Sequence, residues 1–111
     1  MRTANSKLQL LVMALSVMLL ARPEAAFAAG NAQAGKTLAA QWCQSCHIIG
    51  PGVGVASDGA PPFEEVAADP ATNEDGLRAW LFDPHPPMPN LGLSQRQIDD
   101  LTAYILSLAP Q

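Results

Sequence analysis

The residues best suited to chemistry are gathered in one pentapeptide, Cys43-Gln44-Ser45-Cys46-His47, which contains both cysteines of the chain. Cysteines at positions i and i+3 share one face of a helical turn. Two thiols placed in this way can form thioethers with the two vinyl groups on one edge of a porphyrin, and the adjacent histidine can bind the iron. The spacing is the pattern of c-type haem attachment. It predicts one covalent haem c, held by Cys43 and Cys46, with His47 as a ligand of the iron.

Three other uses of the pentapeptide are open at this point. A zinc site needs about four ligands, whereas residues 29–111 contain two cysteines and two histidines, with His85 far along the sequence. A thioredoxin-like dithiol also has two cysteines separated by two residues, but it belongs beside a βαβ pattern, and no strand pattern is visible here. A disulfide between Cys43 and Cys46 would close too small a loop to stabilise the fold much.

Met88 is the candidate for the second axial ligand of the iron. The other three methionines lie within residues 1–28, so Met88 is the one methionine in the rest of the chain. It lies in Asp83–Asn90, where four prolines fix the backbone φ angle and disfavour helix at the residue before each of them. This stretch is therefore expected to be extended and stiff, which suits the presentation of one side chain to a metal. His85, in the same loop, is the competing ligand because imidazole also suits iron.

Residues 1–28 have the pattern of a secretory signal peptide. Two basic residues precede a 14-residue apolar run, Leu8–Ala21, and Ala26–Ala28 offers the small residues needed for cleavage. The alternative is a membrane anchor, but a helix of this length rises about 21 Å, short of the roughly 30 Å hydrocarbon core. We expect cleavage, a mature protein of residues 29–111 with no stable membrane insertion, and a location in the periplasm.

The composition of residues 29–111 limits the possible partners and folds. Three basic and nine acidic side chains give a net charge of −6, which argues against nucleic acid and anionic lipid as partners. The same segment holds 21 large apolar residues against 17 prolines and glycines. Such a chain is near the size at which one core supplies only about 3–5 kcal/mol and a further stabilising element is needed. A multidomain protein and a large dinucleotide-binding enzyme are excluded.

The last helix is the clearest element of the sequence. Its apolar residues recur at spacings of 3, 4 and 3 and so form one stripe: Ile98, Leu101, Ile105 and Leu108. Ser94 and Gln97 in front of the stripe are the two residues of a capping box.

The remaining patterns predict short helices and no sheet. No segment alternates convincingly with period 2, and His47–Pro62, with four glycines and three prolines, is expected to be a loop. The fold class is therefore all-α, with three to five short helices. They are expected over Asn31–Trp42, over Phe63–Ala68, from Thr72 or Asn73 to about Phe82, and from Ser94 to about Pro110.

Together these features resemble a known family, the small bacterial monohaem cytochromes c in which histidine and methionine bind the haem iron. The resemblance covers essentially all of residues 29–111 and rests on the haem motif and on three further segments, Ala60-Pro61-Pro62-Phe63, Pro87-Met88-Pro89 and Ala103-Tyr104-Ile105. It implies a cytochrome c-like fold whose short helices wrap around one covalently bound haem. Residues 29–111 would then be the cytochrome c domain.

The resemblance also implies roles for single residues. His47 would be the proximal ligand and Met88 the distal one. The carbonyl of Pro61 would accept a hydrogen bond from the ring of His47, which fixes its tautomer and raises its basicity. Apolar side chains would form the haem pocket and exclude water: Trp80, Leu77, Leu81, Leu91, Leu93 and the stripe of the last helix.

Two further positions concern the packing of the first helix on the last. Gly35 matches the small residue that lets the two helices cross closely, near Tyr104. Ala39 departs from the family, which often has an aromatic residue at this crossing, and Trp42 is expected to compensate for it.

A haem iron with both axial positions filled by protein has no open site for a substrate, which leaves one-electron exchange. We therefore expect a soluble electron carrier between redox proteins such as a reductase or dehydrogenase and an oxidase, and not an enzyme. The alternative with the same chemistry is a dedicated haem c subunit of a periplasmic dehydrogenase complex. A haem enzyme or gas sensor with a labile sixth ligand and a thiol oxidoreductase are the other interpretations. Haem would also complete the small core, so the chain without it should be largely unfolded.

Overall fold

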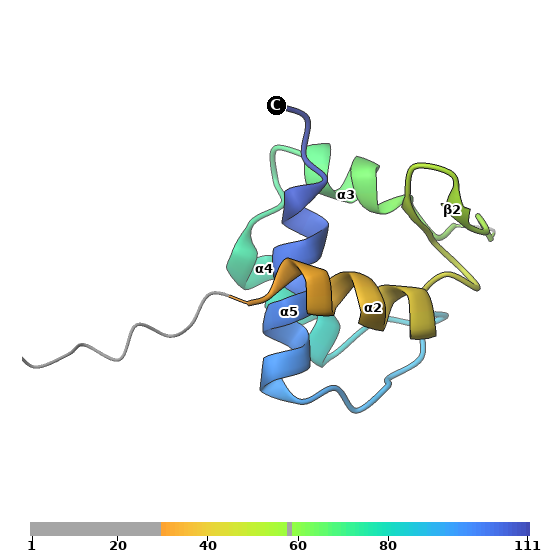
Figure 1. The fold of residues 1–111 in the computed structure, drawn as a ribbon. Coiled ribbons are helices and arrows are strands. Elements are labelled where there is room, and N and C mark those ends of the chain that lie inside the picture. Colours follow the sequence, from red (N-terminus) through yellow and green to blue (C-terminus); the bar gives the residue numbers. More distant parts are fainter. Residues whose placement is uncertain (1–29, 58) are drawn as a thin grey trace, which may run out of the picture.

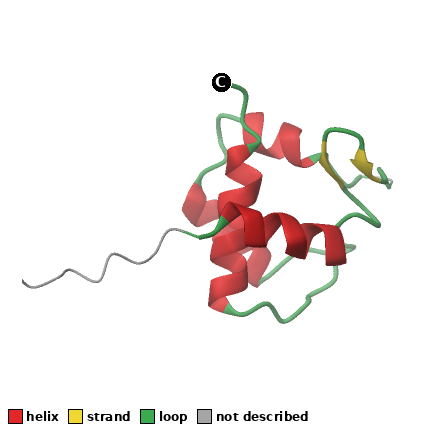
Figure 2. Ribbon diagram, viewed as in Figure 1, coloured by secondary structure: helices red, strands yellow, loops and turns green. Residues whose placement is uncertain are grey.

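The computed structural model describes residues 30–57 and 59–111. The expected signal peptide, residues 1–28, lies outside this part of the chain. The described part contains four helices and one small hairpin: α2 (Ala32–Trp42), β1 (Ile48–Gly50), β2 (Val53–Gly54), α3 (Phe63–Ala68), α4 (Glu74–Phe82) and α5 (Gln95–Ser107) (Figure 1). Each predicted helix is present, and helices dominate the fold (Figure 2). No helix in these residues has both the length and the apolar character needed to cross a bilayer.

Side-chain caps begin three of the helices. Asn31 and Asn73 accept hydrogen bonds from the backbone N–H groups three residues further on, at 3.0 and 2.9 Å. Ser94 and Gln97 form the predicted capping box, in which the Ser94 hydroxyl accepts from the Gln97 N–H and the Gln97 side chain accepts from the Ser94 N–H. These caps satisfy backbone donors that a helix leaves unpaired at its start. Of the two candidates for the start of α4, Asn73 is therefore the cap.

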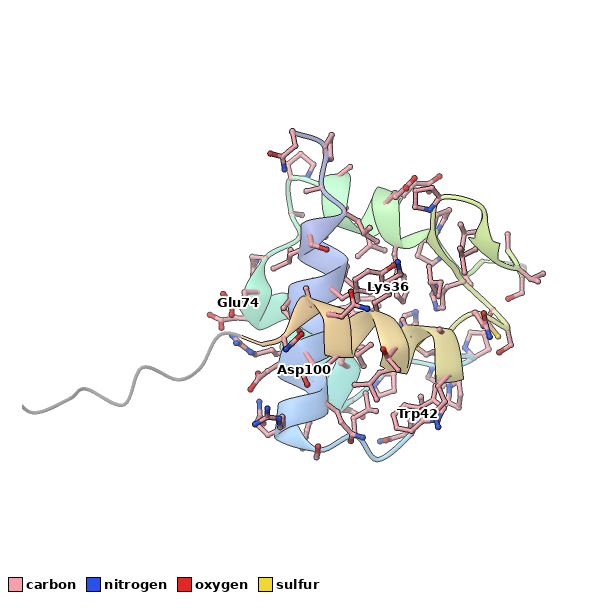
Figure 3. All side chains as sticks on the ribbon, viewed as in Figure 1. Lys36, Trp42, Glu74 and Asp100 are labelled. Carbon is pink, nitrogen blue, oxygen red and sulfur yellow. The ribbon has the colours of Figure 1, made fainter. Side chains whose placement is uncertain are left out.

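Helix α2 lies across α5, and the two backbones approach closely (Figure 1). A Cβ atom at Gly35 would overlap the backbone carbonyl of Asp100 and lie 2.8 Å from Cβ of Tyr104. Glycine is therefore required at this point, as the resemblance implied. Beside it, the Asp100 carboxylate accepts a hydrogen bond from the Asn31 N–H at 2.6 Å, where the two helices meet (Figure 3).

The core forms where α5 meets the other elements. Ile98, Leu101 and Ile105 of the predicted stripe are buried, and Leu108 is half-buried. The other buried apolar side chains come from all parts of the described chain: Ala39, Cys43, Ile49, Phe63, Leu81 and Tyr104. Trp42, at the C-terminal end of α2 (Figure 3), packs partly buried against this core.

Helix α4 is linked to α5 by Arg78. Its guanidinium lies 2.8 Å from the carboxylate of Asp99 on α5 and 2.6 Å from that of Glu74 on its own helix. The hydrogen bond to Asp99 raises the pKa of Arg78 above its ordinary value, and the attraction of Glu74 adds to the effect. The link fixes α4, which carries Trp80, relative to the last helix.

The expectation that the chain has no strand is wrong within the segment 47–62. There β1 and β2 form a two-stranded antiparallel sheet. The sequence pattern does not reveal it because the strands are only three and two residues long and contain glycines. A distant contact stabilises it instead, since the Tyr104 hydroxyl donates a hydrogen bond to the Ile49 carbonyl at 2.7 Å.

Candidate haem site

The pentapeptide with the two cysteines continues α2 as a tight turn. The Cys43 carbonyl accepts hydrogen bonds from the backbone N–H groups of Cys46 and His47, at 3.1 and 2.9 Å. The turn therefore keeps the helical spacing on which the predicted haem attachment depends. Cys43 is 8% exposed, Cys46 lies at the surface, and the two thiols are not joined by a disulfide.

The surroundings of the cysteines do not suit thiolate or zinc chemistry. Burial, with a smaller effect of Cys46, raises the pKa of Cys43 to about 11. A thiol redox site needs the opposite, because reactive cysteines have lowered pKa values. Among residues 30–57 and 59–111, no three histidine, cysteine, aspartate or glutamate side chains are grouped so that they could hold a metal ion. Neither alternative for the pentapeptide is supported by the fold.

His47 is held in one orientation by its neighbours. Its Nδ1 lies 2.7 Å from the carbonyl oxygen of Pro61, the hydrogen bond that the resemblance implied. A carbonyl only accepts, so Nδ1 carries the proton and donates it, and the lone pair of Nε2 is free to bind a metal. The ring of Phe63 lies 5.2 Å from the His47 ring, tilted by 45°. These two contacts fix the orientation of the imidazole within the fold.

A cavity of about 560 Å³ brings distant parts of the sequence together. Five of the predicted site residues line it: Cys43, His47, Pro61, Trp80 and Met88. Cys46, the sixth, does not line the cavity but lies at the surface on the same turn as Cys43. The volume is within the range of about 300–1,000 Å³ found for cofactor pockets, and such pockets are mostly apolar with a few placed polar groups. A cavity with a free imidazole nitrogen, a thioether and a thiol in its wall fits a haem.

Sequence reasoning missed part of the cavity wall. Phe63 and Val66 on α3 line it, and neither was expected there. Four of the apolar residues expected in the haem pocket do line the cavity: Leu77, Leu81, Leu101 and Ile105. Conversely, four residues that were expected in the haem pocket do not line the cavity: Leu91, Leu93, Ile98 and Leu108. Leu91 is exposed, Ile98 is buried within the core, and Leu93 and Leu108 pack partly buried against it.

The loop that carries Met88 is a turn and not an extended segment. The Met88 N–H donates a hydrogen bond to the His85 carbonyl at 3.0 Å, and the Pro86–Pro87 peptide bond is cis. The expectation of an extended stretch is therefore wrong over residues 85–88, where the hydrogen bond closes the chain on itself. Met88 is half-buried against the core, and both it and His85 line the cavity. Both candidate ligands thus reach the same space.

Trp80 forms one wall of the cavity but is not enclosed. Its side chain lines the space, as predicted for a pocket residue, and is 58% exposed. Its ring meets that of His85 edge to face, with centroids 4.4 Å apart and planes at 78°. Aromatic pairs favour this arrangement. The contact attaches the Met88 loop to α4.

Comparison with known proteins assigns the chain to a family. Residues 30–105 match the family described as cytochrome c oxidase, cbb3-type, subunit III. Cytochrome c-552 of Bradyrhizobium diazoefficiens is 40% identical over 94 residues, which cover 85% of this chain and 90% of that relative. No solved structure matches the chain. The matched residues include the haem motif, both His85 and Met88, and the residues that line the cavity. The chain therefore belongs to the cytochrome c family and is a small monohaem cytochrome c with a covalently bound haem c.

Proposed function

We propose that the protein is a one-electron carrier whose haem iron is bound by His47 and Met88. The observation that carries the proposal is that His47, with its Nε2 free, and Met88 line the same cavity as Cys43. Imidazole and thioether ligands together would leave no position on the iron open for a substrate. The bound haem would supply an iron that alternates between the ferric and ferrous states. We therefore infer an electron-transfer protein and not an enzyme.

Each side chain has a distinct task in such a carrier. Cys43 and Cys46 would hold the haem through thioethers, and the Pro61 carbonyl would keep His47 in one tautomer and raise its basicity. The soft Met88 thioether favours ferrous iron and so raises the reduction potential. Apolar side chains of the wall limit the access of water, which keeps the geometry similar in the two oxidation states.

An absorption spectrum and an intact mass of the purified holoprotein test the ligation. Wild type should carry one covalent haem and show the far-red band of a methionine–ferric iron bond. Met88→Ala should abolish this band and allow the ferrous protein to bind carbon monoxide at neutral pH. His85→Ala, a matched change in the same loop, should leave the band in place. If His85→Ala abolishes the band and Met88→Ala does not, His85 is the ligand and the assignment of Met88 is wrong.

We also propose that residues 1–28 direct export and are removed, so that residues 29–111 act in the periplasm. The family match begins at residue 30, next to the expected cleavage site after Ala26–Ala28. Sequencing the N-terminus of the protein from a periplasmic fraction should find Ala29 as the first residue. A chain that begins at Met1 and sediments with membranes would contradict this proposal.

The partners of a free carrier would be redox proteins, a reductase or dehydrogenase on one side and an oxidase on the other. The second candidate function is a dedicated haem subunit of a larger redox complex, and the matching family is itself described as an oxidase subunit. The relative is matched over 90% of its length and so is comparably short, a size that fits both functions. Gel filtration of native material separates the two, since a carrier elutes alone and a subunit elutes with its partners.

A further inference from the structure

The hydroxyl of Tyr104 makes a contact that the electron-carrier function does not by itself require. It donates a hydrogen bond to the carbonyl of Ile49 at 2.7 Å. Tyr104 is 6% exposed and Ile49 is 1% exposed, so water does not compete for this bond. Ile49 lies in β1 only two residues after His47. The bond therefore ties the strand that follows the histidine to the last helix.

The ring of Tyr104 also supports His47 from a second side. It packs edge to face on Phe63, with ring centroids 6.5 Å apart and planes at 67°. Phe63 in turn lies against the His47 ring and follows, by two residues, the Pro61 whose carbonyl accepts the His47 proton. One side chain of α5 thus contacts both segments between which the imidazole is held.

We propose that Tyr104 is a positioning residue for His47, acting through Ile49 on its backbone and through Phe63 on its ring. The inference rests on the proposed binding of the iron by His47. Loss of the hydroxyl would free β1 to move relative to Pro61, and the bond between Nδ1 of His47 and the Pro61 carbonyl would weaken. Because that bond sets the basicity of the ligand, the reduction potential would change with it.

Gly50 offers a way to disturb the same hydrogen bond without altering the tyrosine. A Cβ atom at Gly50 would lie 3.0 Å from the Tyr104 hydroxyl, closer than an ordinary contact. Gly50 is not among the glycines with positive φ, so alanine fits the backbone there. Gly50→Ala should therefore push the hydroxyl away from Ile49, and Tyr104→Phe should remove it. If both act on one bond, their effects will not add.

The experiment compares holoprotein variants: Tyr104→Phe, Gly50→Ala, the double variant, and Ile98→Val as a control on the same helix. Ile98 is buried in the core, does not line the cavity, and takes no part in the hydrogen bond between Tyr104 and Ile49. NMR of the ferrous protein measures the rate at which the His47 Nδ1 proton exchanges with solvent. The midpoint potential and the stability in urea are measured for each variant as well. Tyr104→Phe should speed the exchange about 5- to 10-fold, as expected for loss of one buried hydrogen bond, and shift the potential. Gly50→Ala should change the exchange rate and the potential in the same direction, and the double variant should change them no more than Tyr104→Phe does. Ile98→Val should lower the stability and leave the exchange rate and the potential unchanged.

The proposal is overturned if Tyr104→Phe behaves like Ile98→Val, with lower stability but unchanged proton exchange and unchanged potential. It is also overturned if the effects of Tyr104→Phe and Gly50→Ala add. Should Tyr104→Phe fail to fold, Gly50→Ala alone carries the comparison with the control. Failure of the proposed function is distinct, because wild type itself would then lack the spectrum of histidine and methionine ligation, whatever the variants do.

Discussion

The two candidate ligands of the iron are held in different ways. His47 lies between a helical turn and β1, and the Pro61 carbonyl fixes its ring at 2.7 Å. Met88 lies in a loop that one backbone hydrogen bond, to His85, closes into a turn. The His47 side is therefore shaped by packing and hydrogen bonds between distant segments. The Met88 side is held mainly by this bond within its own loop and by the ring contact of His85 with Trp80.

The prolines of the Met88 loop explain this difference. Four of the six residues from 84 to 89 are prolines, which have fixed φ angles and no backbone N–H. Such a segment has few donors with which to attach itself to the rest of the fold, and its own rings restrict its shape instead. A substitution in the core should therefore disturb the position of His47 before that of Met88. A substitution of Met88 should leave the rest of the fold unchanged.

The largest effect is expected from removing the covalent anchor on the His47 side. In the double variant Cys43→Ala with Cys46→Ala, haem cannot be attached, and the apolar wall of the 560 Å³ cavity loses its main contact. The far-UV circular dichroism should lose most of its helical signal, and the mass should lack haem. Ser45→Ala, between the two cysteines, should keep both. A native helical signal without haem would show that the protein core is sufficient by itself.

Gly35→Ala should weaken the helix crossing behind the His47 side by about 3 kcal/mol, at the upper end for overpacked positions. The added Cβ would overlap the backbone carbonyl of Asp100, which cannot move without α5. Urea denaturation measures the free energy of unfolding. Gly76→Ala in α4 is the matched control, because the added Cβ would make only an ordinary contact of 3.4 Å with Asn73. It should stabilise the helix by about 0.5–1 kcal/mol, and an equal loss in both variants would contradict the close crossing.

Met88→Ala should cost about 1–2 kcal/mol of stability, below the range for fully buried side chains, because Met88 is half-buried. The helical signal should persist, since α2 and α5 do not depend on the loop. Met88→Leu should restore most of the stability by restoring apolar volume, but not the far-red absorption band. If Met88→Ala unfolds the protein as the double cysteine variant does, the two sides are not independent.

The smallest effect concerns alkaline pH. Burial, with a smaller contribution from Glu64, raises the pKa of Tyr104 above its ordinary value of 10.0. The folded protein therefore keeps the phenol proton more tightly than the unfolded chain does. The resulting stabilisation is complete below pH 10 and is lost as the pH rises through the folded-state value. Urea denaturation from pH 8 to 11 should show this loss in wild type and not in Tyr104→Phe, and parallel curves for the two proteins would contradict it.

The sequence predicts those parts of the structure whose causes are local. Asn31 and Ser94 cap helices through hydrogen bonds to residues three positions away, so the helix starts can be read directly from the chain. The contact of His47 with Pro61 spans 14 residues and was expected only from the family resemblance. The hairpin at β1 could not be predicted because its stabilising partner, Tyr104, is 55 residues from Ile49.

The Met88 turn escaped prediction for a different reason. Each proline limits its own φ angle and the residue before it, but these limits do not determine whether the chain reverses direction. The position of Trp80 was predicted only in part. Its place in the helix suggested a pocket residue, and it does line the cavity, but its ring contact with His85 could not be predicted from the helix pattern.

The crossing of α2 and α5 also constrains the order in which the molecule matures. Gln95, the first residue of α5, follows Cys46 by 49 residues. At about 5–20 residues per second, synthesis delivers the start of α5 about 2–10 s after the second cysteine. Until α5 arrives, Gly35 has no backbone to pack against, and the core that buries Cys43 cannot close. The segment that carries both thiols is therefore made well before the helix whose packing encloses Cys43.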